Sequence, residues 1–356
     1  MKEYFDAPKK LRQLPTTRAA YSDRSAWMMS ELSALAYLPF EGENHFKKLL
    51  DMMSRTAKLA RRRSDESVLA SRFESLEDTI RQYIDQQLDD NDATPPALQI
   101  LKNALGSANF ELVETFNTGD TQAFLARRDA DMIAVLAFRG TEANSWKDVK
   151  TDLDARFYKG KDSVKVHTGF RDAYNQIAKQ VRVAIDRLAD EYSLYVTGHS
   201  LGGALAVVAA KELERDTLAA CYTFGSPRVG NEEFGEEIRA PIYRIVNAAD
   251  GVPRVPPSWF TYCIAFVVSF VRQSWGDAIE RNFCGYMHQG DMRYLTACDG
   301  DISKLKVIPN LSMPFRVWRL ARRMIAKGPS IAGGDHRINE YRAKLRSYAE
   351  RRAGTT

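Results

Sequence analysis

The chain is poor in the features that mark several functional classes. It has four cysteines in 356 residues, and they lack the close pairing that zinc sites use. Its longest apolar stretch, from Trp259 to Val271, is shorter than the roughly 20 residues that a membrane-spanning helix needs. With 51 basic and 46 acidic residues the net charge is only +5, so we do not expect nucleic acid as a partner.

The beginning of the sequence also lacks an apolar stretch. MKEYFDAPKKLRQLP opens with charged residues and does not supply the apolar core of a secretory signal. We therefore expect a cytoplasmic location.

A composition change divides the chain into two parts. Residues 24–87 have a charged, helical pattern, which the acidic, proline-containing stretch DDNDATPPA at 89–97 interrupts. We predict an N-terminal helical portion and linker over residues 1–97, and a main domain over residues 98–356.

The main domain alternates short β-rich runs with helical runs. Phe170 to Leu188 carries apolar residues at three- and four-residue steps, which predicts one amphipathic helix. Strand, helix and strand in succession predict a mostly parallel central sheet flanked by helices. The predicted strands are Glu111–Phe116, Ala123–Arg127, Met132–Phe138, Leu194–Thr197, Ala219–Phe224 and Ile242–Asn247.

A serine lies at one of the predicted strand–helix turns. In YVTGHSLGGALAVVAA, Ser200 is flanked at two residues' distance by Gly198 and Gly202, which let the strand and the helix approach each other closely. The alternative is a serine that only caps a glycine-rich turn. A nucleophile at this position would have the backbone N–H of Leu201 beside it, at the start of the helix, to bind an oxyanion.

A serine nucleophile needs a base and a carboxylate to orient that base. Where the nucleophile lies at such a strand–helix turn, these follow the serine in the order acid, then histidine, which leaves only His288 and His336 among the five histidines. We favour His336, in a glycine-containing loop, because His288 lies in a strand-like stretch. Asp250 follows the predicted strand Ile242–Asn247 and is the candidate acid, although it could be a simple turn residue.

Several segments in order resemble the class 3 lipase family. They are AWMMSELSALAYLPF, LAFRGTEANSWKDVKTDL, VHTGFRDAY, VTGHSLGGALA, TFGSPRVGN, IVNAADGVPRVPP and DHRINEY. The resemblance implies an α/β-hydrolase fold with an N-terminal helical portion and helical insertions, and a triad of Ser200, Asp250 and His336. It also implies that Thr141, after FRG, supplies a second oxyanion donor beside Leu201.

The resemblance implies a lipase or esterase that cleaves carboxylic esters of lipids through an acyl-enzyme on Ser200. Such chemistry needs no metal or organic cofactor. The partners that we expect are a lipid or ester substrate and peripheral contact with a membrane, and no particular oligomeric state is predicted. The alternatives are phospholipase A1-type activity on membrane phospholipid, or a non-catalytic membrane- or partner-binding protein on the same fold. Relatives in this family also make export by a specialised route an alternative to the cytoplasm.

Three segments are candidates for contact with lipid. The stretch Glu142–Leu153 corresponds to the family's lid, but it is charged, with a single tryptophan, which weakens that role. Trp259–Val271 is rich in apolar residues and lies between the acid and the base. Pro314–Gly328 carries a stripe of basic residues beside apolar ones, the pattern of an interfacial helix. Packing of the last two segments against the core is the alternative.

Overall fold

The computed structural model describes residues 4–5, 9–12, 20–38, 96–119, 121–140, 157–159, 163–254, 273, 285–298, 301–328 and 334–354. The chain forms two compact units, Leu38–Asn103 and a larger one of Met1–Tyr37 with Ala104–Thr356. Helix α5 (Pro96–Ser107) contains the second junction between them. Residues 1–37 thus belong to the unit that holds the sheet, and the domain boundary at residue 97 stays a prediction.

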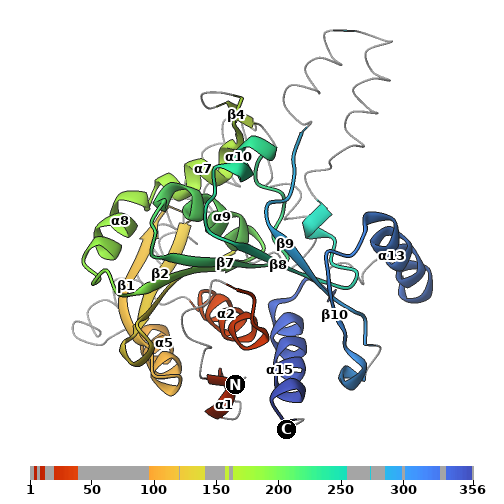
Figure 1. Ribbon diagram of the computed structural model, residues 1–356, viewed down its shortest axis with the longest axis horizontal. Helices are drawn as coiled ribbons and strands as arrows, with labels where there is room; N and C mark the ends of the chain where they lie inside the picture. The colour runs from red at the N-terminus through yellow and green to blue at the C-terminus, as the bar shows by residue number, and fades with distance from the viewer. Residues whose placement is uncertain are drawn as a thin grey trace, which may run out of the picture. The chain divides into compact units, whose positions relative to one another are not determined.

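A mixed sheet is the centre of the larger unit (Figure 1). The described residues give it eight strands in the order β1-β2-β3-β6-β7-β8-β9-β10. Strands β3, β6, β7, β8 and β9 are parallel, and β1, β2 and β10 run antiparallel to their neighbours. The strands are β1 (Glu111–Thr118), β2 (Thr121–Arg128), β3 (Ile133–Phe138), β6 (Ser193–His199), β7 (Leu218–Phe224), β8 (Ile242–Asn247), β9 (Asp291–Leu295) and β10 (Val307–Pro309).

The central strands have the composition that burial on both faces requires. Every residue of β3, with the sequence IAVLAF, is buried, and β6 is buried from Leu194 onward. Parallel strands covered on both faces are expected to be apolar throughout rather than alternating. The predicted mostly parallel sheet flanked by helices is confirmed.

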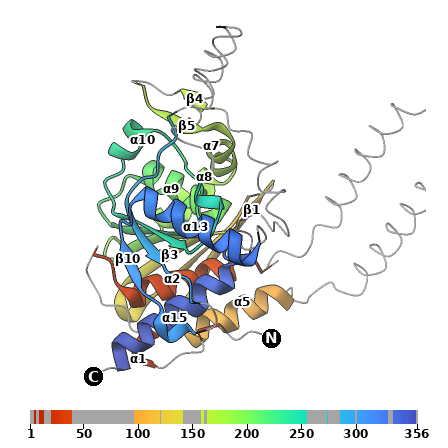
Figure 2. The ribbon, with the colours of Figure 1, turned by 90° about the vertical axis from the view of Figure 1, so that its right-hand side faces the viewer.

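Helices cover both faces of this sheet. On one face, α9 (Leu201–Leu213) packs against β3, β6 and β7, and α7 (Thr168–Asn175) packs against α9. On the other face, α2 (Asp23–Leu35) contacts the same three strands and α15 (Ile338–Gly354) packs against α2 (Figures 1 and 2). Because α9 lies between the sheet and α7, it is buried almost all round.

One predicted helix is two helices in the structure. The pattern from Phe170 to Leu188 contains α7 and α8 (Ala178–Asp186), separated at Gln176 and Ile177. The Ile177 N–H donates to the carbonyl of Tyr174, three residues back, at 3.0 Å, so the turn tightens there to the 3-10 pattern. The apolar spacing continues through the break because Ile177 itself is fully buried.

The remaining described elements are short or lie outside these layers. Strands β4 (Phe157–Lys159) and β5 (Lys165–His167) form a separate antiparallel pair. The helices are α1 (Lys9–Arg12), α10 (Glu232–Glu236) and α13 (Met313–Lys327), and short 3-10 helices are at Asp129–Asp131, Val252–Arg254 and Ile302–Lys304. No helix of the described residues is long and apolar enough to cross a membrane.

Candidate active site

Ser200 occupies a strained turn between β6 and α9. Its backbone has φ 57° and ψ −127°, a conformation that non-glycine residues rarely adopt. Two interactions stabilise the turn: the Ser200 N–H donates to the carbonyl of Phe224 at 2.9 Å, and the Ser200 carbonyl accepts from the Gly203 N–H at 3.0 Å. The hydroxyl is thereby held at the carboxyl edge of the parallel strands, where α/β proteins bind their ligands.

The two glycines of the motif are required by close backbone contact. A Cβ on Gly198 would lie 2.1 Å from the carbonyl oxygen of Gly202, and one on Gly202 would lie 2.4 Å from that of Phe138. No side chain fits at such distances. Glycine is therefore required at both positions for β3, β6 and α9 to meet around Ser200 as they do.

The structure brings Ser200, His336 and Asp250 together. The Nε2 atom of His336 lies 2.9 Å from the Ser200 Oγ, and its Nδ1 atom lies 3.0 Å from both carboxylate oxygens of Asp250. A carboxylate can only accept, so Nδ1 carries the proton and Nε2 is free to accept the serine proton. Ser200 and Asp250 are each only 1% exposed, and the His336 side chain is 13% exposed.

Tyr341 on α15 holds the aspartate, and sequence reasoning gave it no role. Its hydroxyl donates to the Oδ2 of Asp250 and accepts the N–H of Asn247 at 3.0 Å. Burial, and after it the charge of Asp250, raises the pKa of Tyr341 well above its ordinary value, so the hydroxyl remains a donor. The N–H of Val252 donates to the other oxygen at 2.9 Å. The only signal in the sequence was the position of Tyr341, five residues after His336.

A second set of hydrogen bonds connects the two loops of the site. The Oδ2 of Asp335 accepts the N–H of Ala249 at 2.8 Å, and the Asp335 carbonyl accepts the side-chain amide of Asn247 at 2.8 Å. Lys344 donates to the Oδ1 of Asn247 at 2.6 Å. Asp335 thus fixes the loop that carries Asp250, and the carboxylate that contacts the His336 imidazole is that of Asp250.

His199 supports the main chain of His336. Its Nε2 lies 2.6 Å from the His336 carbonyl oxygen and its Nδ1 lies 2.7 Å from the Tyr37 hydroxyl. Burial, followed by the neighbouring His336, lowers the pKa of His199 well below its ordinary value. The ring is therefore neutral, with Nε2 donating to the carbonyl and Nδ1 accepting from the tyrosine.

Of the three remaining histidines, His45 lies outside the described residues, and His288 and His167 do not contact the serine. His288 lies in the segment before β9, and not within a strand as its surroundings suggested. Its Nε2 is 2.6 Å from the Pro253 carbonyl oxygen. His167 stacks on Phe170, with ring centroids 4.0 Å apart. Of the two histidines that follow Ser200, the structure places His336 at the serine.

One proposed oxyanion donor is described and the other is not. Leu201 is the first residue of α9, where N–H groups have no partner within the helix. Thr141 lies outside the described residues. Its neighbour Gly140 is close to the serine, because a Cβ on Gly140 would be 3.3 Å from the Ser200 Cβ. The lid segment Glu142–Leu153 and the apolar segment Trp259–Val271 also lie outside the described residues.

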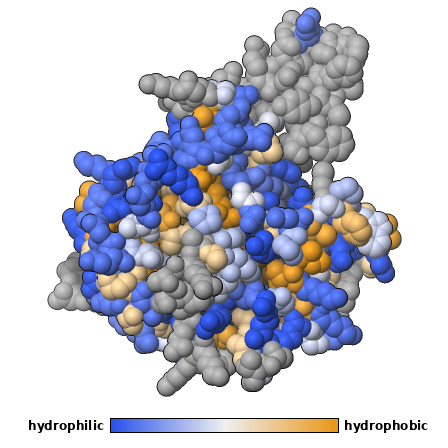
Figure 3. Space-filling view, viewed as in Figure 1, coloured by the Kyte–Doolittle hydropathy of each residue, from blue (hydrophilic) through white to orange (hydrophobic). Residues whose placement is uncertain are grey.

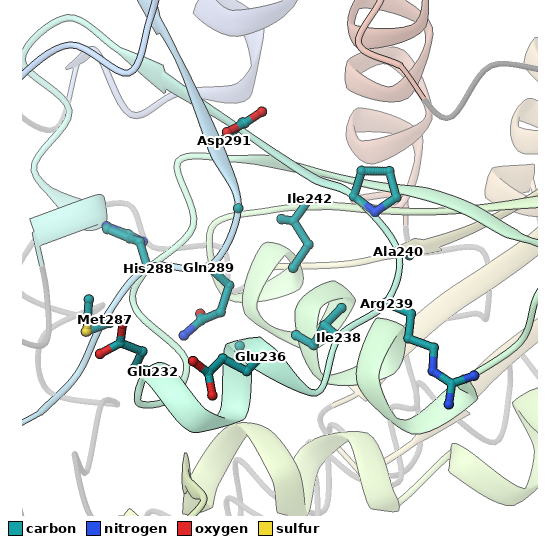
Figure 4. Close-up of a pocket in the computed structure, with 13 residues that line it drawn as sticks. Glu232, Glu236, Ile238, Arg239, Ala240, Ile242, Met287, His288, Gln289 and Asp291 are labelled. Carbon is teal, nitrogen blue, oxygen red and sulfur yellow. The ribbon is translucent and has the colours of Figure 1, made fainter.

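A pocket of about 460 Å3 lies elsewhere on the sheet (Figure 4). Its walls come from α10 and from the residues that lead into β8 and β9, including Glu236, Ile242, His288 and Asp291. These are the amino ends of β8 and β9, whereas Ser200 and Asp250 follow the carboxyl ends of β6 and β8. The pocket is therefore separate from the candidate active site.

The fold and the site together define a class of protein. A mostly parallel sheet, a serine at a strand–helix turn, and a histidine and an aspartate on later loops are the arrangement of an α/β-hydrolase with a serine nucleophile. Residues 135–260 match the family described as Lipase (class 3).

Similar proteins are fungal lipases. A lipase of Rhizopus niveus is 34% identical over 178 residues, which cover 46% of this chain and 45% of the relative. Secreted mono- and diacylglycerol lipase 1 of Fusarium solani is 41% identical over 104 residues, 27% of this chain and 31% of the relative. The solved structure of the Rhizomucor miehei lipase propeptide complex has 27% identity and a TM-score of 0.46, covering 59% of this chain and 63% of that one. The chain spans less than half the length of the Rhizopus niveus relative.

These relatives contradict the expected cytoplasmic location. Those of Fusarium solani and Malassezia restricta are named as secreted lipases, which points to an extracellular location. The expectation was wrong because it depended on the absence of one kind of export signal near the start of the sequence, and such an absence does not determine where a protein functions.

Proposed function

We propose that this protein is a serine hydrolase that cleaves carboxylic esters of lipids. The observation that carries the proposal is the continuous hydrogen-bonded line from the Ser200 Oγ through His336 to Asp250, with distances of 2.9 and 3.0 Å. A serine hydroxyl is a weak nucleophile until a base removes its proton. Here the base is in contact with it, and the carboxylate fixes the tautomer that the base needs.

In the proposed first step, the Ser200 Oγ attacks the ester carbonyl carbon while His336 Nε2 accepts the serine proton. A tetrahedral intermediate forms, with its negative charge on the former carbonyl oxygen. Asp250 stabilises the imidazolium that results. His336 then returns the proton to the departing alcohol oxygen, which leaves an acyl group on Ser200.

In the proposed second step, water attacks the acyl-enzyme. His336 accepts a proton from the water and delivers it to Ser200, so that the fatty acid is released and the enzyme is restored. The N–H groups of Leu201 and Thr141 bind the oxyanion in both steps. Loss of one such donor typically lowers kcat by about a hundredfold or more.

The lipid substrate is inferred from the relatives. Their names describe lipases, including mono- and diacylglycerol lipases and a triacylglycerol lipase. Because lipid esters of this kind gather in droplets and membranes, we propose that the protein meets its substrate through peripheral contact with a lipid surface.

A phospholipid ester is a second candidate, and a group of arginines favours it. Arg228 Nη1 donates to the carbonyl of Arg254 at 2.6 Å. After burial, the charge of Arg316 lowers the pKa of Arg228, Arg244 and Arg254. Burial, followed by the charges of Arg316 and Arg228, lowers the pKa of Arg244 to about 9. Crowded cations of this kind would be stabilised by the phosphate of a head group.

Hydrolysis of p-nitrophenyl esters of graded chain length tests the proposal. We expect Ser200→Ala to lose nearly all activity, and Ser107→Ala, at an exposed serine at the end of α5, to retain it. Equal, slow hydrolysis by the wild type and Ser200→Ala on every ester would favour a non-catalytic protein. Phosphatidylcholine as substrate, with release of fatty acid measured, separates the phospholipid candidate from glycerides.

A further inference from the structure

Helix α13 is amphipathic, but charged side chains on it face the protein and large apolar side chains face solvent, the reverse of the usual arrangement. Three of its arginines, at successive turns, face the body of the protein. Arg316 Nη1 lies 3.5 Å from the Met292 sulfur, and the guanidinium of Arg319 lies 6.0 Å from the ring centroid of Tyr294. Arg323 Nη1 lies 3.1 Å from the Asp335 carboxylate, with only 15% of its side chain exposed.

Four large apolar side chains of α13 face outward instead, while Leu320 is half-buried. Ile325 is 88% exposed, Phe315 58%, Trp318 54% and Val317 47%. These four residues form the outer face of α13, and they are half of the eight large apolar side chains that are exposed among the described residues. α13 lies at the periphery of the unit, on the side turned toward the viewer in Figure 2. Figure 3 shows apolar side chains mixed with polar ones at this edge.

Stability of the fold alone would not favour arginines that face inward. Apolar groups are normally buried and guanidinium groups left in water. In α13, burial lowers the pKa of Arg316, and the Nε atom of Arg319 is buried without a hydrogen-bond partner. α13 therefore uses three arginines in contacts with the body of the protein and keeps four large apolar residues in contact with solvent.

We propose that the outer face of α13 is a docking surface for a lipid layer that carries anionic head groups, an inference that rests on the proposed function. An apolar face flanked by cationic groups matches the boundary between acyl chains and head groups. Arg322 is exposed and lies 5.6 Å from the ring of Trp318, so a cation accompanies the apolar residues at the surface.

The charge of α13 favours an anionic lipid layer over a second copy of the chain as the partner of this face. The sequence of α13, MPFRVWRLARRMIAK, has no acidic residue. The described cation at its outer face is Arg322, beside Trp318. Two such faces together would bring cations of the same sign near each other, whereas anionic head groups would neutralise them. The same charge pattern excludes a strongly basic partner surface.

The docking helix is attached to the loop of the candidate active site. Arg323, near its C-terminal end, pairs with Asp335, and Asp335 precedes His336 and accepts the N–H of Ala249. Insertion of the outer face into a lipid layer would therefore hold the catalytic edge of the sheet close to the ester substrate.

Vesicle co-sedimentation tests the proposal. The probes are phosphatidylcholine vesicles with and without phosphatidylglycerol, and the variant is the double substitution Trp318→Glu and Ile325→Glu. We expect its apparent affinity for the anionic vesicles to fall by about tenfold or more, because two inserted apolar groups are replaced by charges of the sign that the head groups repel. The control is Val183→Glu, at an exposed valine of α8 (42%), which should bind as the wild type does.

Two further measurements distinguish the possible failures. Hydrolysis of soluble p-nitrophenyl acetate should be unchanged in the double variant, and Ser200→Ala should still bind vesicles. A double variant that binds like the wild type, or a Val183→Glu variant that loses as much affinity, overturns the docking surface while leaving the hydrolase intact. Light scattering that shows a wild-type dimer, and a monomer for the double variant, also overturns it in favour of a second copy. If vesicles bind but no ester is hydrolysed, the proposed function fails and the docking surface stands.

Discussion

The hydroxyl of Tyr341 offers a sharp test of how the candidate triad is held. It donates to the Asp250 carboxylate and accepts from the Asn247 N–H at 3.0 Å, and the residue is fully buried. Tyr341→Phe removes this one oxygen and leaves the Asn247 N–H without its acceptor. A buried donor left unsatisfied costs about 1–3 kcal/mol, so we expect the free energy of unfolding to fall by that amount.

The same substitution should affect activity separately from stability. Asp250 would keep the Val252 N–H and His336 as partners but lose the Tyr341 hydrogen bond to Oδ2. Misplacement of a catalytic group by about 1 Å can lower the rate by about a hundredfold, and since two partners remain we expect kcat to fall by about tenfold with little change in KM. The measurements are urea unfolding and steady-state hydrolysis of a soluble p-nitrophenyl ester.

Tyr294→Phe is the matched control. The Tyr294 hydroxyl is also buried and donates to the Ala248 carbonyl at 3.0 Å, without contact to the triad. We expect a loss of stability of about 1 kcal/mol and unchanged kcat. If both variants keep full kcat, the Tyr341 hydroxyl is only a structural group and the argument that it positions Asp250 is wrong.

Two further predictions concern steric fit and pH. Gly225 has φ +59°, and a Cβ there would lie 2.6 Å from the Asp250 Oδ2, so we expect Gly225→Ala to lose most esterase activity and about 1–2 kcal/mol of stability. The control is Gly106→Ala, which meets open space within α5 and should be as stable as the wild type or more so. A fully active Gly225→Ala would contradict the site geometry. Burial, and then the charges of nearby arginines, lowers the pKa of His288 well below its ordinary value. Below about pH 6.5 the unfolded state therefore binds a proton at His288 that the folded state does not. The stability that depends on neutral His288 is fully present above this pH, and the free energy of unfolding falls by up to about 1.4 kcal/mol per pH unit below it. Urea unfolding between pH 7.5 and 5.5 should show a shallower dependence in His288→Gln, and an unchanged slope would refute this assignment.

Much of the sheet could be predicted because the signals are local. The central strands are short, apolar and separated by helical runs, and each strand needs only its own composition to be identified. The helix from Phe170 to Leu188 shows the limit. Its apolar spacing is the same in one helix or in two that bury the same side, so the break at Ile177 depends on hydrogen bonds that the pattern does not encode.

The residues around the triad were harder to predict than the triad positions themselves. Chain order and the turn motif identified Ser200 and reduced the choice of base to His288 or His336. Tyr341, Asn247 and Asp335 act through contacts between α15, β8 and the loop between α13 and α15, and no spacing rule connects them.

By itself, the sequence determined the strained turn at Ser200, because only glycine fits at Gly198 and Gly202, and it determined the succession of strands and helices through local composition. Only the tertiary structure decided that His336, which is 136 residues from Ser200 along the chain, is the histidine that reaches it. It also decided that three arginines of α13 face inward and four of its large apolar residues face outward. The physical reason is that periodicity defines two faces of a helix, whereas the neighbours that pack against it choose which face is covered.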